Sequence, residues 1–216
     1  MSRTPHVPVP FAHRGPRARL FAALYVRFSG RHEVLVRERK DALFAGLKGR
    51  VLELGAGAGA NLARLCADVE YAAVEPNPWL RRELERTARE LGRAALVRDG
   101  VAEALPFEDA SFDAVVTTLV LCSVSDVERT LAEIRRVLRP GGTYVFLEHV
   151  AARAGSARRF RQRLARPFTR SLACGCHPDR ELEPALRSAG FAHVDLEAFE
   201  VPLPIVGPHV AGRARR

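Results

Sequence analysis

The chain has 216 residues, 47% of them hydrophobic, and a formal net charge of +9. This length and composition predict one domain with a sizeable core. No run of eighteen apolar residues occurs, and the first twenty residues lack the apolar stretch of a signal peptide. Four cysteines are too few for a disulfide framework in a chain this long. We therefore expect a soluble, cytoplasmic protein with no integral membrane contact.

The positive charge gathers toward the two ends of the chain. The first forty residues are rich in arginine, and residues 153–170 contain no acidic side chain. Such a surface raises the question of nucleic-acid, membrane or acidic-substrate binding. The middle of the chain is nearly balanced, and a preference for arginine over lysine can follow genomic base composition. We expect no nucleic-acid partner.

Residues 1–48 predict an N-terminal arm and a helical lid. Residues 1–16 contain four prolines and no sustained pattern, which is typical of a flexible or surface-draped arm. A second helical segment covers about Glu33 to Leu47. Before it, four apolar residues recur at helical spacing: Leu20, Phe21, Leu24 and Phe28. Packing on the core is the favoured interpretation of that first helix. A substrate lid and a membrane-surface helix stay open, and with them peripheral membrane association.

Residues 49–216 alternate short apolar runs with helical segments, the signature of βαβ units and a parallel sheet. The runs are RVLEL, YAAVE, AALVRD, FDAVVTTL and TYVFLEHV. Helices are expected near Ala60–Ala67, Pro78–Leu91, Asp126–Leu138, Arg158–Arg170 and Glu181–Ala189. Ligands of such a doubly wound sheet lie at the carboxyl ends of its strands. The run FAHVDLEAF and the final PLPIVGPHVAGRARR add further strand candidates. Because prolines bound its approach, we expect the last strand at an edge.

A glycine turn, VLELGAGAGANLARL, follows the first predicted strand. Gly55, Gly57 and Ala60 satisfy G-x-G-x-x-G/A, a pattern that lets backbone N–H groups approach a ligand. Glu75 ends the second strand, where a carboxylate can accept hydrogen bonds from ribose hydroxyls. Both features suit NAD and S-adenosylmethionine, so the turn alone leaves a dehydrogenase and a methyltransferase open.

Two downstream segments are more specific: AEALPFEDASFDAVVTTLVL and IRRVLRPGGTYVFLEH. Together with VLELGAGAGAN and VEPN, they give residues 50–149 a resemblance to class I S-adenosylmethionine-dependent methyltransferases. The resemblance implies S-adenosylmethionine as cofactor and S-adenosylhomocysteine as product. It also implies an α/β, Rossmann-like, doubly wound sheet of seven strands. That sheet is mostly parallel with an antiparallel edge strand and has helices on both faces.

The same resemblance implies a set of cofactor-binding residues. The loop under the methionine part comprises Glu53, Gly55, Gly57 and Gly59, and Asn61 opens the helix that follows. The ribose side comprises Glu75, Pro76 and Asn77. The adenine segment comprises Gly100, Val101 and Ala102, and the methionine end after the fourth strand comprises Thr117 and Leu119. Val101 stands where the family commonly has an aspartate, which leaves Asp99 or backbone groups to contact adenine.

Further segments, TLVLCSV, LEHVAA, a GC before an acidic helix and PHVAGRA, resemble the subgroup that includes alkyl-thiol S-methyltransferases. That likeness implies a small-molecule thiol as acceptor. The hydrophobic membrane-binding N-terminus of the subgroup's animal members is not evident. A phospholipid headgroup amine and a quinone-precursor ring carbon stay open as acceptors. A non-catalytic cofactor-binding module stays open as another class.

Candidate catalytic residues are histidines. A thiol with a reference pKa of about 8.5 is partly ionised at neutral pH, so a dedicated base is not required. If there is one, His149 at the end of the fifth strand is the first candidate and His177 the second. The pattern Cys174-x-Cys176-His177 lacks the common C-x-x-C spacing and a fourth ligand, so we expect no metal.

Overall fold

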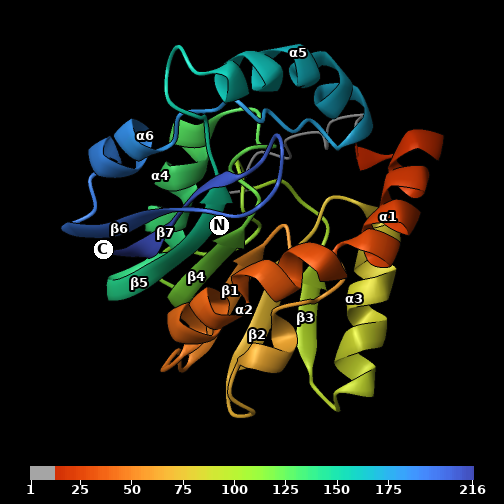
Figure 1. Cartoon of the computed structure of the whole chain (residues 1–216). Helices are drawn as coiled ribbons and strands as arrows, with labels where there is room; N and C mark the ends of the chain where they lie inside the picture. Colours follow the sequence, from red (N-terminus) through yellow and green to blue (C-terminus); the bar gives the residue numbers. More distant parts are fainter. Residues whose placement is uncertain (1–12) are drawn as a thin grey trace.

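The computed structural model describes residues 13–216, so the proline-rich arm predicted for residues 1–16 lies mostly outside the described residues. One seven-stranded sheet runs through the molecule in the order β3-β2-β1-β4-β5-β7-β6 (Figure 1). The parallel strands are β1 (Arg50–Leu54), β2 (Glu70–Val74), β3 (Ala95–Arg98), β4 (Phe112–Thr118) and β5 (Leu138–His149). The antiparallel strands are β6 (His193–Glu200) and β7 (Pro208–Arg215). The predicted seven-stranded, mostly parallel sheet is confirmed.

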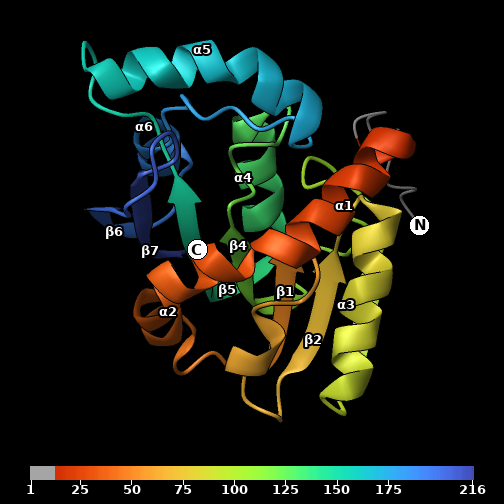
Figure 2. The same cartoon turned by 45° about the vertical axis from the view of Figure 1, so that its right-hand side comes forward.

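Helices cover both faces of the sheet (Figures 1 and 2). They are α1 (Pro16–Phe28), α2 (Gly30–Phe44), α3 (Pro78–Glu90), α4 (Val127–Val137), α5 (Ala157–Leu172) and α6 (Glu183–Ser188). Leu131 of α4 and Leu186 of α6 pack in the core cluster on one face. Phe44 of α2 and Leu84 of α3 pack in a second cluster on the other. α5 lies beyond the carboxyl end of β5 (Figure 2).

The sequence sets the starts of α3, α4 and α5 through side-chain caps. The Asn77 side chain accepts hydrogen bonds from the backbone of Trp79 and Leu80, and Pro78 occupies the first turn, where its missing N–H costs nothing. The side chains of Asp126 and Ser156 cap α4 and α5, and each accepts one hydrogen bond, from the backbone N–H of Arg129 and of Arg159 respectively. These caps fix the residue at which each helix begins. They thereby set the length of the loop that joins the preceding segment to the helix.

The final strand was predicted at an edge, and this prediction is wrong. β7 pairs with β5 on one side and with β6 on the other, so β6 is the edge strand. Pro202 and Pro204 precede the strand and Pro208 is its first residue, so no interior N–H of the ladder is lost. Gly212 lets the neighbouring backbone approach, since a Cβ there would lie 2.0 Å from the carbonyl oxygen of Asp195.

The helix predicted near Ala60–Ala67 is also wrong in type. The structure has one 3₁₀ turn, Leu62–Arg64, after which Leu65 is extended (φ −80°, ψ 141°). Leu62 and Leu65 are both buried, and their three-residue spacing is satisfied by a single 3₁₀ turn. The chain therefore crosses to β2 by a short connection rather than a full helix.

The N-terminal helices are docked on the rest of the molecule. The Asn77 side chain donates to the carbonyl of Ala18, which joins α1 to the end of β2. Val36 of α2 packs against Leu147 of β5 and Ala211 of β7. Between residues 13 and 216, no helix combines the length and apolarity that a membrane crossing requires.

Candidate functional site

A pocket opens where the strand order reverses, between β1 and β4, the expected ligand position in a doubly wound sheet. Its floor comes from the loops after β1, β2 and β4. Its far side comes from α1 and from the turn between α5 and α6. Segments from both halves of the chain therefore meet at one site.

The glycine turn after β1 requires glycine at two positions in the pocket wall. Gly55 and Gly57 both have φ +57°, in the left-handed region. A Cβ on Gly55 would lie 2.7 Å from Val120 Cγ2, and one on Gly57 would lie 3.0 Å from Tyr25 Oη. The turn thus presents bare backbone to the pocket, which suits close approach of a ligand.

Glu75, at the end of β2, is held by two backbone hydrogen bonds. Its Oε2 accepts from Gly57 N–H and its Oε1 from Asn77 N–H, both at 2.9 Å. Burial raises the pKa of Glu75 to about 7, and the two hydrogen bonds oppose that shift. A carboxylate offers about four acceptor positions, so about two stay available on the pocket side. That arrangement fits a pair of adjacent hydroxyl groups.

A buried polar network lies under the glycine turn. Glu53 accepts from Tyr71 Oη at 2.5 Å and from Asn61 Nδ2 at 2.6 Å. Lys40, 2% exposed, donates to Asn61 Oδ1 and to Glu33 of its own helix. Burial raises the pKa of Glu53, against the hydrogen bonds from Tyr71 and Asn61. Glu53 and Asn61 therefore support the turn from below and tie it to α2.

The remaining cofactor residues expected from the sequence fall into two groups. Those that line the pocket are Pro76, Asn77, Val101, Ala102 and Leu119. Within the described part of the chain, those that do not line the pocket are Gly59, Gly100 and Thr117. Thr117 lies within β4, where its hydroxyl hydrogen-bonds Tyr144 Oη at 2.8 Å, and the next residue, Thr118, lines the pocket instead. A Cβ on Gly59 would meet Leu84 of α3 at 2.8 Å, so that glycine permits helix packing.

The Asp99 carboxylate is already engaged. It accepts from Arg14 Nη2 and from Arg81 Nη1, each at 2.9 Å. Of the two alternatives for an adenine contact, Val101 and Ala102 line the pocket, whereas Asp99 is not among its lining residues.

Several lining residues were not predicted from the sequence. Phe21 and Tyr25 reach the pocket from α1, four residues apart on the helix that the periodicity indicated. Cys174 reaches it from the α5–α6 turn, and burial, followed by the charge of Glu75, raises the pKa of its thiol to about 12. The helical spacing was the available signal for Tyr25, and the CGCH segment, typical of a turn over an acceptor pocket, was the signal for Cys174.

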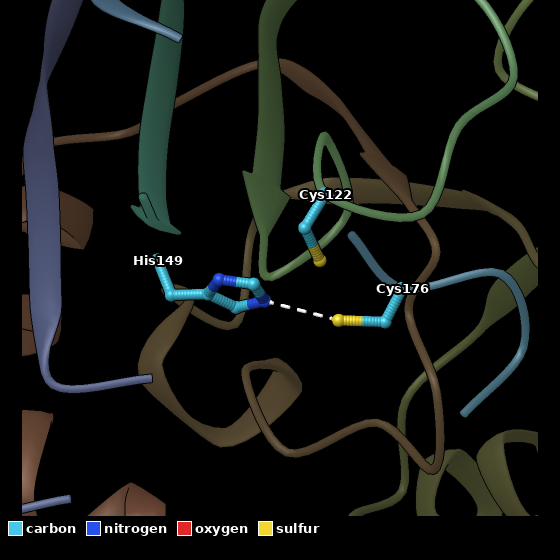
Figure 3. A group of neighbouring side chains, drawn as sticks. All are labelled: Cys122, His149 and Cys176. Carbon is cyan, nitrogen blue, oxygen red and sulfur yellow. Dashed lines mark hydrogen bonds between the residues drawn. The ribbon is translucent and has the colours of Figure 1, made fainter. Parts of the chain in front are cut away.

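The two candidate bases lie outside the pocket lining. The imidazole of His149 is buried beside Cys176, with Nε2 3.3 Å from Sγ (Figure 3). Burial opposes its charged form, yet the neighbouring Cys122 outweighs burial and raises the pKa of His149. His177 donates its backbone N–H to Cys122 O, and its side chain lies in an arginine-rich surface hollow. Burial, followed by the charges of Arg180 and Arg170, lowers the pKa of His177.

Comparison with known proteins adds sequence and fold evidence. Residues 52–146 match the family model described as a methyltransferase domain. Thiol S-methyltransferase TMT1A of Homo sapiens is 35% identical over 90% of this chain and 85% of its own length. Thiol S-methyltransferase TMT1B of Rattus norvegicus is 36% identical over 91% of this chain and 83% of its own. A solved S-adenosylmethionine-dependent methyltransferase of Thermotoga maritima shares the fold, with TM-score 0.64, 22% identity, and coverage of 91% and 98%.

Proposed function

This chain belongs to the class I S-adenosylmethionine-dependent methyltransferases, and from that premise we propose that it methylates the sulfur of a small-molecule thiol. The observation that carries the proposal is the pocket itself. Its cofactor side is polar, with Glu75 and the glycine turn. Another part of its wall is apolar, with Leu119, Val120 and Val124. The relatives named as thiol S-methyltransferases align over most of the chain.

We assign the cofactor contacts by position in the pocket. The backbone of the Gly55–Gly57 turn faces the methionine part, and the free acceptor positions of Glu75 take the ribose hydroxyls. The backbone of Val101 and Ala102 takes the adenine. Leu119, a non-glycine residue with φ +58°, holds a strained backbone conformation at the pocket, as functional positions often do. When bound, S-adenosylmethionine supplies a methyl group on a positively charged sulfonium sulfur.

The chain's contribution to the reaction is positioning and exclusion of water. An acceptor thiol that has lost its proton attacks the methyl carbon in line, and the bond from that carbon to the sulfonium sulfur breaks. Holding the two reactants in that geometry lowers the barrier by ~7 kcal/mol or more. Tyr25 lies over the glycine turn and Cys174 closes the pocket from the α5–α6 turn. With no residue assigned as base, the proton leaves the thiol for solvent before attack.

A methylation assay tests the acceptor. The wild-type chain is incubated with S-adenosylmethionine and separate panels of alkyl thiols, amines and phenols, and products are identified by mass spectrometry. Methyl thioethers as the main products support the proposal. Products only from amines or phenols overturn it. Calorimetric titration with S-adenosylhomocysteine and with NADH checks the cofactor in parallel, and tight binding of NADH alone would contradict the whole assignment.

A second surface bears on how an acceptor reaches the pocket. α5 carries four apolar side chains at four-residue intervals, each more than half exposed: Phe160, Leu164, Phe168 and Leu172. Arginines stand between them in the sequence, and α5 contacts α1, whose Leu20 and Phe28 are also exposed. An apolar stripe with arginines beside it is the pattern of a helix that lies in the surface of an anionic bilayer.

We infer from this stripe that the protein attaches peripherally to anionic membranes and draws apolar thiols from them. Flotation with vesicles containing phosphatidylglycerol tests it, with pure phosphatidylcholine vesicles alongside. The double variant Phe160→Ser/Phe168→Ser should lose association, while the matched variant Leu91→Ser, which changes an exposed leucine on the far end of α3, should keep it. Equal flotation of both variants, or none of the wild type, contradicts the inference. Methylation of the headgroup amine in vesicles that also contain phosphatidylethanolamine would favour a phospholipid acceptor.

A further inference from the structure

Three metal-ligand side chains converge behind the pocket wall: Cys122, His149 and Cys176 (Figure 3). They come from the loop after β4, the end of β5 and the α5–α6 turn. Cys122 and His149 are 2% and 4% exposed, and Cys176 is partly exposed. Figure 3 shows the imidazole directed at the Cys176 sulfur, with the Cys122 sulfur facing the same space. Neither sulfur is in a disulfide.

The spacing of the three ligand atoms suits a small thiophilic ion. All three lie within 4.8 Å of one another, and His149 Nε2 is 3.3 Å from Cys176 Sγ. Three atoms with such separations share a point within about 2.8 Å of each, against Zn–S and Zn–N distances of about 2.3 and 2.0 Å. Shifts of about half an ångström or slightly more would therefore complete three bonds. A tetrahedral ion puts S and N about 3.5 Å apart, close to the spacing present.

The protein contacts of this group are otherwise sparse. Cys122 Sγ has a backbone carbonyl at 3.5 Å and a serine hydroxyl at 3.4 Å, both long contacts to a weak donor. Arg180 is fixed close by, donating to the carbonyl oxygens of Leu121 and Val124. Two thiolates and one neutral imidazole around a divalent cation form a neutral unit, which a buried site beside an arginine accommodates.

We propose that Cys122, His149 and Cys176 bind one Zn²⁺ ion. Binding forms two Zn–S bonds and one Zn–N bond and releases the two thiol protons to solvent. Three protein ligands leave the fourth position of a tetrahedral ion for water or another small ligand. The ion joins Cys122 to His149, 27 residues further along the chain, and to Cys176, 54 residues further along. It thereby anchors the α5–α6 turn, which carries Cys174 to the pocket edge. Its role lies beyond the proposed methyl transfer and does not depend on it.

Metal titration of the reduced full chain tests the site. After treatment with a chelator, Zn²⁺ is titrated in competition with a chromophoric chelator, and Co²⁺ is titrated separately as a spectroscopic probe. We expect one ion per chain, a Co²⁺ spectrum with thiolate-to-metal charge transfer, and a higher thermal unfolding temperature in the ion-loaded form. Absence of stoichiometric binding to the folded wild type overturns the proposal.

Two variants separate this site from other cysteines. Cys122→Ser/Cys176→Ser should weaken Zn²⁺ binding at least about 100-fold and abolish the charge-transfer band, because both thiolates are lost. The matched variant Cys66→Ser, at an exposed cysteine outside the group, should bind like the wild type. Should the double variant fail to fold by circular dichroism, His149→Gln with both cysteines intact replaces it, with weaker binding and an altered Co²⁺ spectrum expected. Unchanged binding in the folded variant, or a Cys122–Cys176 disulfide in the protein as isolated, contradicts a zinc site.

Discussion

Substitution of Glu75 by glutamine should make the stability of the protein depend differently on pH. The folded protein holds the Glu75 proton more tightly than the unfolded chain, because burial raises its pKa from 4.5 to about 7. A raised carboxyl pKa stabilises the fold below the unfolded value, and that stabilisation is lost as the pH rises through the folded value. Glutamine does not titrate, so the Glu75→Gln variant does not lose this stabilisation as the pH rises.

The size of the effect follows from the two pKa values. Between pH 5 and pH 8, a carboxyl group with pKa 4.5 unfolded and about 7 folded loses about 2.5 kcal/mol of stabilisation. The partly buried His32 and the buried His209, whose pKa values burial lowers to about 4, act in the opposite direction at low pH. They are the same in both proteins, so they cancel in the difference between wild type and Glu75→Gln.

Urea unfolding at pH 5, 6, 7 and 8 measures that difference, followed by circular dichroism and by fluorescence of the single tryptophan, Trp79. The free energy of unfolding of Glu75→Gln should rise relative to wild type by about 2.5 kcal/mol from pH 5 to pH 8. A difference constant within about 0.5 kcal/mol over this range would refute the reasoning. Affinity for S-adenosylhomocysteine should show the opposite pH trend in the wild type. Ribose hydroxyls favour the carboxylate, so binding should weaken below about pH 7 and stay flat in Glu75→Gln.

Three further substitutions test other parts of the structure. Gly57→Ala introduces a Cβ at φ +57° against Tyr25, so calorimetry should show S-adenosylhomocysteine binding at least about tenfold weaker. Wild-type affinity would contradict the claim that the turn requires glycine at this position. Lys40→Met removes the buried cation that donates to Asn61 and Glu33, so denaturant unfolding should show a free energy of unfolding lower by about 3 kcal/mol. A decrease below about 1 kcal/mol would mean that this network contributes little to stability. Gly212→Ala forces β7 away from β6 and should cost about 3 kcal/mol in the same experiment, with an unchanged midpoint as the contrary result.

Local patterns were sufficient for most elements of the fold. Alternating apolar runs and helical segments, with helices expected from Pro78 and Asp126, placed five strands and the main helices close to their observed positions. The position of β7 was not readable in this way, because pairing between β5 and β6 depends on contacts between distant segments. The prolines near β7 suggested an edge, yet they lie before the strand or at its first residue.

In the site, too, some residues could be placed from the local sequence and others depended on the folded structure. Thr117 and Thr118 are neighbours on β4, and strand alternation sends one to Tyr144 and the other to the pocket. A one-residue uncertainty in where a strand ends therefore exchanges an interior residue for a lining residue. The group around His149 was missed for a related reason. The sequence pairs Cys176 with its neighbour His177, whereas the turn directs their side chains to different places.

The place of β7 between β5 and β6 has a consequence for synthesis of the chain. A ribosome makes β6 before the strand that separates it from β5, so a nascent chain with β6 emerged still has no partner for it. Until β7 arrives, both β5 and β6 present an unpaired edge, the kind of surface on which nascent chains associate with one another. Variants that weaken β7 should therefore reduce yield in the cell by more than their effect on the stability of the finished fold.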